Sequence, residues 1–137
     1  MTPAEAVARK AKVILAADDQ AENILMLESL IEHQGFTFFG VGSGAECLSL
    51  APRIGPRLIL LDIQMPELDG FETCRRLRAI DPLRHVPVAF LTACKSAADV
   101  RAGIAAGGND FIVKPFDPEK LIARVVHWTS RRVSDAA

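Results

Sequence analysis

Residues 58–70 read LILLDIQMPELDG, and this stretch decides the fold class of the chain. The run Leu58 to Leu61 is apolar without interruption, as expected for a strand that is covered on both faces rather than on one. Asp62 follows this run directly, and Pro66 and Gly70 then turn the chain away. The pattern predicts a central strand of a parallel sheet that ends at an acidic residue.

Similar apolar runs recur along the chain and alternate with amphipathic stretches, which is typical of an α/β fold. Two further near-continuous runs predict central strands, and two more interrupted runs predict strands nearer the sheet edges. The central runs are Val13 to Ala17 and Val88 to Leu91, and the edge runs are Phe36 to Val41 and Phe111 to Val113. We therefore expect five βα units that build one five-stranded parallel sheet with helices on both faces.

Apolar residues at helical spacing predict a buried stripe on three of the helices between these strands. The stripes are, in chain order, Ile24, Leu27, Leu30 and Ile31; Phe71, Cys74 and Leu77; and Leu121, Ile122, Val125 and Val126. Asp19 with Glu22 three residues later predicts a capping box, and Asp117 before Pro118 predicts a helix start. The Gly-Gly-Asn segment 107–109 predicts a helix end.

The composition of the 137 residues restricts the class of protein further. Half of them are hydrophobic and 24% are charged, which suits one globular domain. The net charge of −1 gives no basic excess for direct binding to nucleic acid or to an anionic membrane. The three cysteines suit neither a disulfide framework nor a metal knuckle. Because neither a signal peptide nor a membrane span is recognisable, we expect a soluble, cytoplasmic protein.

Polar residues follow four of the predicted strands at their carboxyl ends. Asp18 and Asp19 follow the first strand in the chain, whereas Asp62 follows the third, Thr92 the fourth and Lys114 the fifth. Each residue alone has an ordinary structural explanation, such as a helix cap or a turn. In open parallel sheets, however, ligands bind beyond the carboxyl ends of the strands. We therefore expect these five side chains to form one site.

Three carboxylates in one place predict a bound cation. Two unit charges about 4 Å apart repel each other by roughly 1 kcal/mol in water and by roughly 4 kcal/mol at an effective dielectric constant near 20. Oxygen ligands without His or Cys suit Mg²⁺. A carboxylate beside such an ion, a hydroxyl and an ammonium can accept a phosphoryl group. Asp62 is the expected nucleophile, and Asp18 and Asp19 are the expected metal ligands.

Four motifs give the chain a specific resemblance to a known family. They are ILAADDQ at residues 14–20, LILLDIQMPELDG at 58–70, FLTA at 90–93 and DFIVKPF at 110–116. With these motifs the chain resembles the receiver domain of bacterial two-component response regulators. The resemblance covers residues 12–131 and leaves 1–11 as an N-terminal tail and 132–137 as a C-terminal tail or linker stub. It implies a doubly wound, flavodoxin-like (βα)5 fold with strand order 2-1-3-4-5.

The resemblance also implies a role for each site residue. Asp62 is the implied phosphoacceptor, and Lys114 would pair with the phosphoryl group. Asp18 and Asp19 would bind Mg²⁺ together with Asp62 and the backbone carbonyl of Gln64. Thr92 would be the switch hydroxyl, Phe111 the aromatic switch residue, and the Lys114-Pro115 bond would be cis.

Two departures from the family pattern lie outside this site. Arg57 stands where an acidic residue is common, and Gly108 replaces the usual Ala of a Gly-Ala pair. Gln64 and Cys94 occupy positions through which family members tune their dephosphorylation rate.

These observations predict a signalling switch rather than an enzyme, although the domain would take part in its own phosphotransfer and dephosphorylation. The expected donor is a phosphohistidine on a histidine kinase or a histidine phosphotransfer protein. The fourth helix, fifth strand and fifth helix of the βα units would bind a downstream effector, and pairing with a second copy stays open. The alternatives are an adaptor that takes no phosphate, a receiver segment of a longer regulator or hybrid kinase, and a small aspartyl phosphatase. A phosphatase of the haloacid dehalogenase type needs an acid where Gln64 stands.

Overall fold

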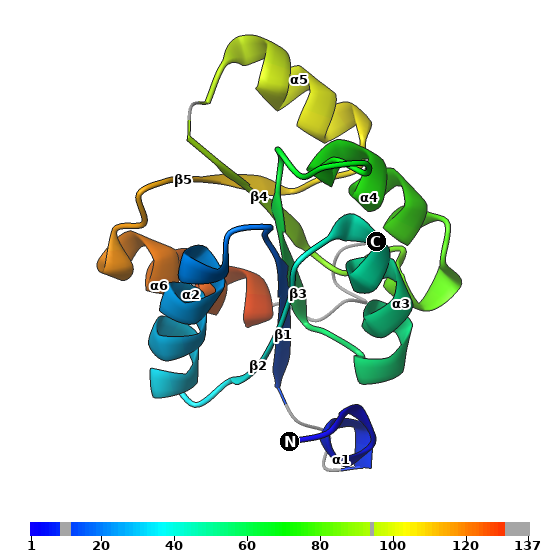
Figure 1. Ribbon diagram of the computed structural model, residues 1–137, viewed down its shortest axis with the longest axis vertical. Helices are drawn as coiled ribbons and strands as arrows, with labels where there is room; N and C mark the ends of the chain where they lie inside the picture. The colour runs from blue at the N-terminus through cyan, green and yellow to red at the C-terminus, as the bar shows by residue number, and fades with distance from the viewer. Residues whose placement is uncertain (9–11, 94, 131–137) are drawn as a thin grey trace.

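The computed structural model describes residues 1–8, 12–93 and 95–130. Five β-strands alternate with α-helices along this part of the chain (Figure 1). The strands are β1 Val13–Ala17, β2 Thr37–Val41, β3 Leu58–Asp62, β4 Val88–Thr92 and β5 Asp110–Val113. The helices are α1 Pro3–Ala8, α2 Ala21–His33, α3 Gly44–Ile54, α4 Gly70–Arg78, α5 Ala97–Ala105 and α6 Pro118–Thr129, with a 3-10 turn η1 at Asp81–Leu83.

The strands form one parallel sheet in the order β2-β1-β3-β4-β5, as the resemblance implies. The three strands predicted to be central are fully buried along their length, and the two predicted edge strands lie at the edges. β3 and β4 each extend one residue beyond the predicted apolar run, so that Asp62 and Thr92 are the last residues of their strands. The order changes direction between β1 and β3, which is where ligands bind in doubly wound folds.

Helices cover both faces of the sheet. α2 and α6 pack on one face through Leu27, Ile31, Leu121 and Val125, whereas α3, α4 and α5 lie on the other face (Figure 1). The predicted stripe on α6 is wrong at Val126, which is 48% exposed. The side chains of Leu121 and Val125 one turn apart already fill the contact with the sheet.

The predicted helix ends are confirmed in two cases and wrong in one. Asp117 caps α6 by accepting hydrogen bonds from the backbone N–H groups of residues 119 and 120, and Gly107 ends α5 with a φ of +94°. The capping box at Asp19 does not form, because Gln20 is the N-cap of α2 and makes no side-chain capping bond. The Asp18 carboxylate instead accepts the Gln20 N–H at 2.9 Å.

The expected N-terminal tail differs from the structure. Residues Pro3–Ala8 form α1, which packs against α3 and buries Ala6 in the same core cluster as Cys47 and Ala51. The contact of Ala6 with α3 stabilises this short helix. The sequence does not predict it, because six residues are too few to show a helical periodicity. The predicted C-terminal tail at 132–137 lies outside the described residues. No helix in the described part of the chain is long and apolar enough to cross a membrane.

Candidate functional site

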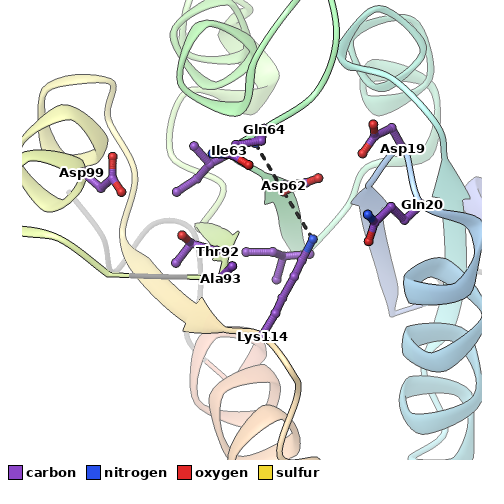
Figure 2. Close-up of a pocket in the computed structure, with 10 residues that line it drawn as sticks. Asp19, Gln20, Asp62, Ile63, Gln64, Thr92, Ala93, Asp99 and Lys114 are labelled. Carbon is purple, nitrogen blue, oxygen red and sulfur yellow. Dashed lines mark hydrogen bonds and ion pairs between the residues drawn. The ribbon is translucent and has the colours of Figure 1, made fainter.

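The carboxyl ends of β1, β3, β4 and β5 meet around one cavity of about 450 Å³ (Figure 2). Its lining includes Asp19, Asp62, Thr92 and Lys114, four of the five residues that the sequence places at strand ends. The fifth, Asp18, does not line the cavity but contacts the Lys114 ammonium, at 2.9 Å between Nζ and Oδ2. The predicted convergence of these side chains is therefore present in the structure.

Asp18 is held as a buried carboxylate by three partners. Its residue exposure is 1%, and its oxygens accept hydrogen bonds from the Gln20 backbone N–H at 2.9 Å and the Asn23 side-chain amide at 3.1 Å. The ion pair with Lys114 completes this arrangement. A buried charge is tolerated when it is paired and hydrogen-bonded in this way, so Asp18 occupies a fixed position beside the cavity.

Asp62 is nearly as buried, at 6% exposure, but its charge is less well satisfied. Its Oδ1 lies 3.3 Å from Lys114 Nζ and accepts the Gln64 backbone N–H at 3.3 Å. Burial and the neighbouring Asp18 together raise the pKa of Asp62 to about 6, although Lys114 opposes this shift. A carboxylate with this environment is stabilised by any further positive charge that enters the cavity.

The three acids could share a metal ion. One oxygen from each of Asp18, Asp19 and Asp62 lies within 4.8 Å of the other two. Asp19 is exposed, which gives an ion access from solvent, whereas Asp18 and Asp62 are buried. A set of hard oxygen donors, beside a cavity large enough for water molecules, fits Mg²⁺ with part of its hydration shell retained.

The two expected switch residues lie on neighbouring strands. Thr92 ends β4 and is 7% exposed, and it lies opposite Val113 of β5. Phe111 is 9% exposed, and its ring centroid lies 5.3 Å from that of Phe90. The ring of Phe71 also contacts Phe90, with 5.1 Å between the ring centroids, so that Phe71, Phe90 and Phe111 form an aromatic row. The ring of Phe111 is therefore already buried in this structure, and a movement linked to Thr92 stays a prediction.

The remaining features implied by the resemblance have mixed outcomes. The Lys114-Pro115 peptide bond is cis, as implied. Gln64 lines the cavity, whereas Cys94 lies outside the described residues. Arg57 is exposed in the loop before β3, away from the cavity.

Sequence reasoning missed several residues that contact or line the site, among them two polar side chains on helices. Asn23 binds Asp18, and Asp99 lines the cavity from α5. Neither follows a strand directly, so the rule about strand ends does not select them. Asn23 lies in the first turn of a helix that begins beside Asp18, a signal that can be used once the helix start is known.

These side chains together can bind a divalent cation and present one fixed carboxylate to an electrophile. Thr92 and Lys114 line the same cavity as Asp62, so a hydroxyl and an ammonium are available to the charge on a transferred group. The arrangement suits transfer of a phosphoryl group to Asp62.

Comparison with known proteins identifies related sequences and structures. A sequence profile described as "Response regulator receiver domain" matches residues 14–126. The DNA-binding response regulator MtrA of Mycolicibacterium paratuberculosis is 38% identical over 112 residues, which are 82% of this chain and 48% of that protein. The response regulator PleD of Caulobacter vibrioides has the same identity over 82% of this chain and 25% of its own length. The chain thus spans about half or less of these relatives.

Solved structures give the same fold. The chemotaxis protein CheY4 of Vibrio cholerae superposes with a TM-score of 0.83 at 27% identity, covering 85% of this chain and 98% of that one. The receiver domain of the sensor histidine kinase PA1611 from Pseudomonas aeruginosa has a TM-score of 0.81 at 30% identity, covering 88% and 99%. That receiver domain has a magnesium ion coordinated in its active site cleft.

Proposed function

This chain belongs to the response regulator receiver domain family, and on that premise we propose that it is a phosphorylation-dependent signalling switch with Asp62 as the phosphoacceptor. The observation that carries the proposal is the position of Asp62. Its carboxylate ends β3, is nearly buried, and lies within 3.3 Å of the Lys114 ammonium and beside two further acids. Two-component signalling uses a carboxylate in these surroundings to accept phosphate.

The proposed donor is a phosphohistidine on a histidine kinase or a histidine phosphotransfer protein. An oxygen of Asp62 attacks the phosphorus atom, the N–P bond breaks, and the imidazole leaves with the electron pair and takes up a proton. The product is an acyl phosphate on Asp62. Lys114, which now bridges Asp18 and Asp62, would pair with the phosphoryl oxygens. The domain is not an enzyme for another substrate, but it takes part in this transfer and in its own dephosphorylation.

Asp18, Asp19, Asp62 and the backbone carbonyl of Gln64 would hold Mg²⁺ in this protein. When bound, the ion would supply positive charge against the acids and the incoming phosphoryl oxygens. Gln20 and Asn23 support this role indirectly, because their hydrogen bonds fix the Asp18 carboxylate beside the cavity.

The proposed output is a change of the surface formed by α5, β5 and α6. New phosphoryl oxygens would attract the Thr92 hydroxyl, and the adjacent Phe111 ring and the neighbouring backbone would repack. Val113 on β5 is 47% exposed and Ile104 on α5 is 67% exposed, so this surface already presents apolar side chains to a partner. We propose a protein effector or effector domain as that partner, in the cytoplasm, with pairing of two copies as a further outcome.

A phosphorylation assay tests the acceptor directly. The wild type and Asp62→Asn are incubated with Mg²⁺ and phosphoramidate, and intact mass followed by site mapping reports the modification. We expect one phosphoryl group on Asp62 in the wild type and none in the variant. Unmodified wild type that also fails to bind beryllofluoride would instead indicate an adaptor that takes no phosphate.

A further inference from the structure

A fourth carboxylate faces the phosphoacceptor cavity from α5. Asp99 is half-buried in the first turn of that helix and lines the cavity together with Asp62, Thr92 and Lys114. Figure 2 shows Asp99 on the side of the cavity opposite Asp19, with its carboxylate directed toward the open space. The cavity mouth therefore has an acid on each side.

As an acid in the first turn of α5, Asp99 has the general stabilisation of a negative charge near a helix N-terminus, but no specific contact among the described residues fixes its carboxylate. The N-cap of α5 is Ser96, whose Oγ accepts the backbone N–H of Asp99 at 3.0 Å, so capping uses the backbone of Asp99 rather than its carboxylate. Asp99 is also not one of the three acids whose oxygens lie within 4.8 Å of one another. Within residues 1–8, 12–93 and 95–130, the carboxylate of Asp99 has no hydrogen bond or ion pair.

The charge around the cavity is consequently unbalanced. Among the described residues that line the cavity or contact its lining, Lys114 supplies the one cation against Asp18, Asp19, Asp62 and Asp99. One divalent ion held by the first three acids would offset two of the three excess negative charges and would leave the charge of Asp99 uncompensated. Because Asp99 lines the same cavity as Asp62, an anionic phosphoryl donor that reaches Asp62 is repelled by this carboxylate.

We propose that Asp99 is a specificity-determining residue whose negative charge slows the capture of small anionic phosphoryl donors at Asp62. This inference rests on the proposed function of Asp62. A protein donor can cover Asp99 with a basic or hydrogen-bonding group of its own surface, whereas a free dianion cannot. Asp99 would thereby favour transfer from a protein over transfer from metabolites such as acyl phosphates.

The reaction with acetyl phosphate defines the effect to be measured. An oxygen of Asp62 forms a bond to phosphorus, the bond from phosphorus to the acetyl oxygen breaks, and acetate leaves with the electron pair, so that no proton is required. Acetyl phosphate is a dianion near neutral pH. Phosphoramidate carries one negative charge less and releases ammonia. Because Coulomb energy is proportional to charge, the effect of Asp99 must be larger for acetyl phosphate.

The test compares the rate of Asp62 phosphorylation in the wild type, Asp99→Asn and two controls, with saturating Mg²⁺. Asp81→Asn removes the same charge from an exposed residue of η1, the short turn that precedes β4 and does not line the cavity. Asp99→Glu keeps the charge and reports any effect of substitution itself. For Asp99→Asn we expect the rate with acetyl phosphate to rise about fivefold at low ionic strength, and the rate with phosphoramidate about twofold. Both increases should largely disappear near 1 M salt, where the Debye length is about 3 Å.

Two equilibrium measurements separate this effect from a change in metal affinity. We expect Asp99→Asn to bind the anion beryllofluoride more tightly than the wild type does, and to bind Mg²⁺ equally well or slightly more weakly by calorimetry. If the rate rises because Mg²⁺ binds better, Asp99→Asn must bind Mg²⁺ more tightly than the wild type does. Such a change would overturn the proposal.

The remaining outcomes are also decisive. Equal rates for Asp99→Asn and Asp81→Asn would contradict the role of Asp99, and so would an increase that is the same for both donors or that persists at high salt. If the wild type takes no phosphoryl group from either donor, or if Asp62→Asn is still modified, the proposed function itself fails. These two kinds of failure are therefore distinguishable.

Discussion

Burial and the neighbouring Asp18 raise the pKa of Asp62 from 3.8 to about 6, so the folded chain binds this proton more tightly than the unfolded chain does. In the metal-free protein the resulting stabilisation is fully present below the unfolded pKa of 3.8 and is lost as the pH rises through about 6. We therefore expect the free energy of unfolding of the wild type to fall across this range relative to that of Asp62→Asn. The relative decrease should be at most about 3 kcal/mol.

Urea unfolding with a chelator present, at several pH values in this range, measures the difference. Asp81→Asn is the matched control, because this exposed acid lies on η1 and away from the cavity. Its stability should run parallel to that of the wild type. If the free energy of unfolding of Asp62→Asn changes with pH just as that of the wild type does, the pKa of Asp62 is not raised in the folded protein.

A second prediction concerns Asp19, the exposed member of the three acids. Removing its charge takes away one expected oxygen ligand and also one source of repulsion. We expect Asp19→Asn to weaken Mg²⁺ binding by about tenfold or more, while the metal-free protein becomes slightly more thermally stable. Calorimetric titration and thermal unfolding with chelator measure the two effects. An unchanged affinity for Mg²⁺ would remove Asp19 from the ligand set.

At the scale of single residues, the sequence predicts the site residues that directly follow strands and misses those that reach the site from helices. Asp18, Asp62, Thr92 and Lys114 are recognisable because each comes directly after an apolar run. Asn23 and Asp99 are not, because their proximity depends on where α2 and α5 begin and how these helices pack. The raised pKa of Asp62 likewise depends on burial, which a sequence pattern does not quantify.

At the scale of elements, Gly108 leaves space for the ring of Phe90 on β4. A Cβ atom at Gly108 would lie 2.1 Å from Cε2 of Phe90, and one at Gly103 would lie 2.4 Å from Cζ of Phe111. The two glycines thus leave room for the aromatic row that joins β4 and β5. This explains why Gly108 stands where the family usually has Ala.

We expect Gly108→Ala to destabilise the protein by about 1–3 kcal/mol, because the ring of Phe90 is fully buried and has little freedom to move. Combining it with Phe90→Leu should cost less than the sum of the two single substitutions, which a double-mutant cycle in urea measures. Gly42→Ala is the control, since the nearest atom to its added Cβ is 3.7 Å away. Additive costs would show that the two residues do not compete for the same space.

Asp110 joins β5 to α6. Its carboxylate accepts hydrogen bonds from Arg124 and from Trp128, the latter at 2.8 Å. Burial raises the pKa of Asp110, but these hydrogen bonds and that of the Phe111 N–H outweigh it and lower the pKa overall. The stabilisation is therefore fully present above the ordinary Asp pKa and is lost as the pH falls through the lowered value.

Substituting Asp110→Asn keeps the shape of the side chain and removes its charge. We expect a loss of about 1–2 kcal/mol of unfolding free energy near pH 7, and a smaller loss as the pH is lowered below about 4. Urea unfolding at both pH values measures this dependence. A loss that does not change with pH would mean that the charge of Asp110 contributes nothing to the contact.

Element types and most boundaries follow from the sequence, whereas short or locally unusual pieces do not. All five strands lie where apolar runs predict them. The prediction is strongest for β1, β3 and β4, because a strand buried on both faces must be apolar along its length. The helix α1 and the N-cap at Gln20 are exceptions. Both depend on contacts with residues distant in sequence or on a competing hydrogen bond to Asp18.

At the scale of the whole molecule, the sheet order brings four separate strand ends to one edge. Periodicity predicts a five-stranded parallel sheet but not its order, which the resemblance supplies and the structure confirms. With β1 between β2 and β3, the acids after β1 and β3 become neighbours, and β4 and β5 add Thr92 and Lys114. The site is thus a product of topology as much as of residue type.

The most direct test of the central claim is a crystal structure of the protein with Mg²⁺ and beryllofluoride, a mimic of the phosphoryl group. We expect beryllofluoride on an oxygen of Asp62, in contact with the Thr92 hydroxyl and the Lys114 ammonium. We also expect Mg²⁺ to be held by Asp18, Asp19 and Asp62 together with the Gln64 carbonyl. Beryllofluoride bound elsewhere, or no metal beside these acids at saturating Mg²⁺, would show that Asp62 is not the phosphoacceptor of a magnesium-dependent site.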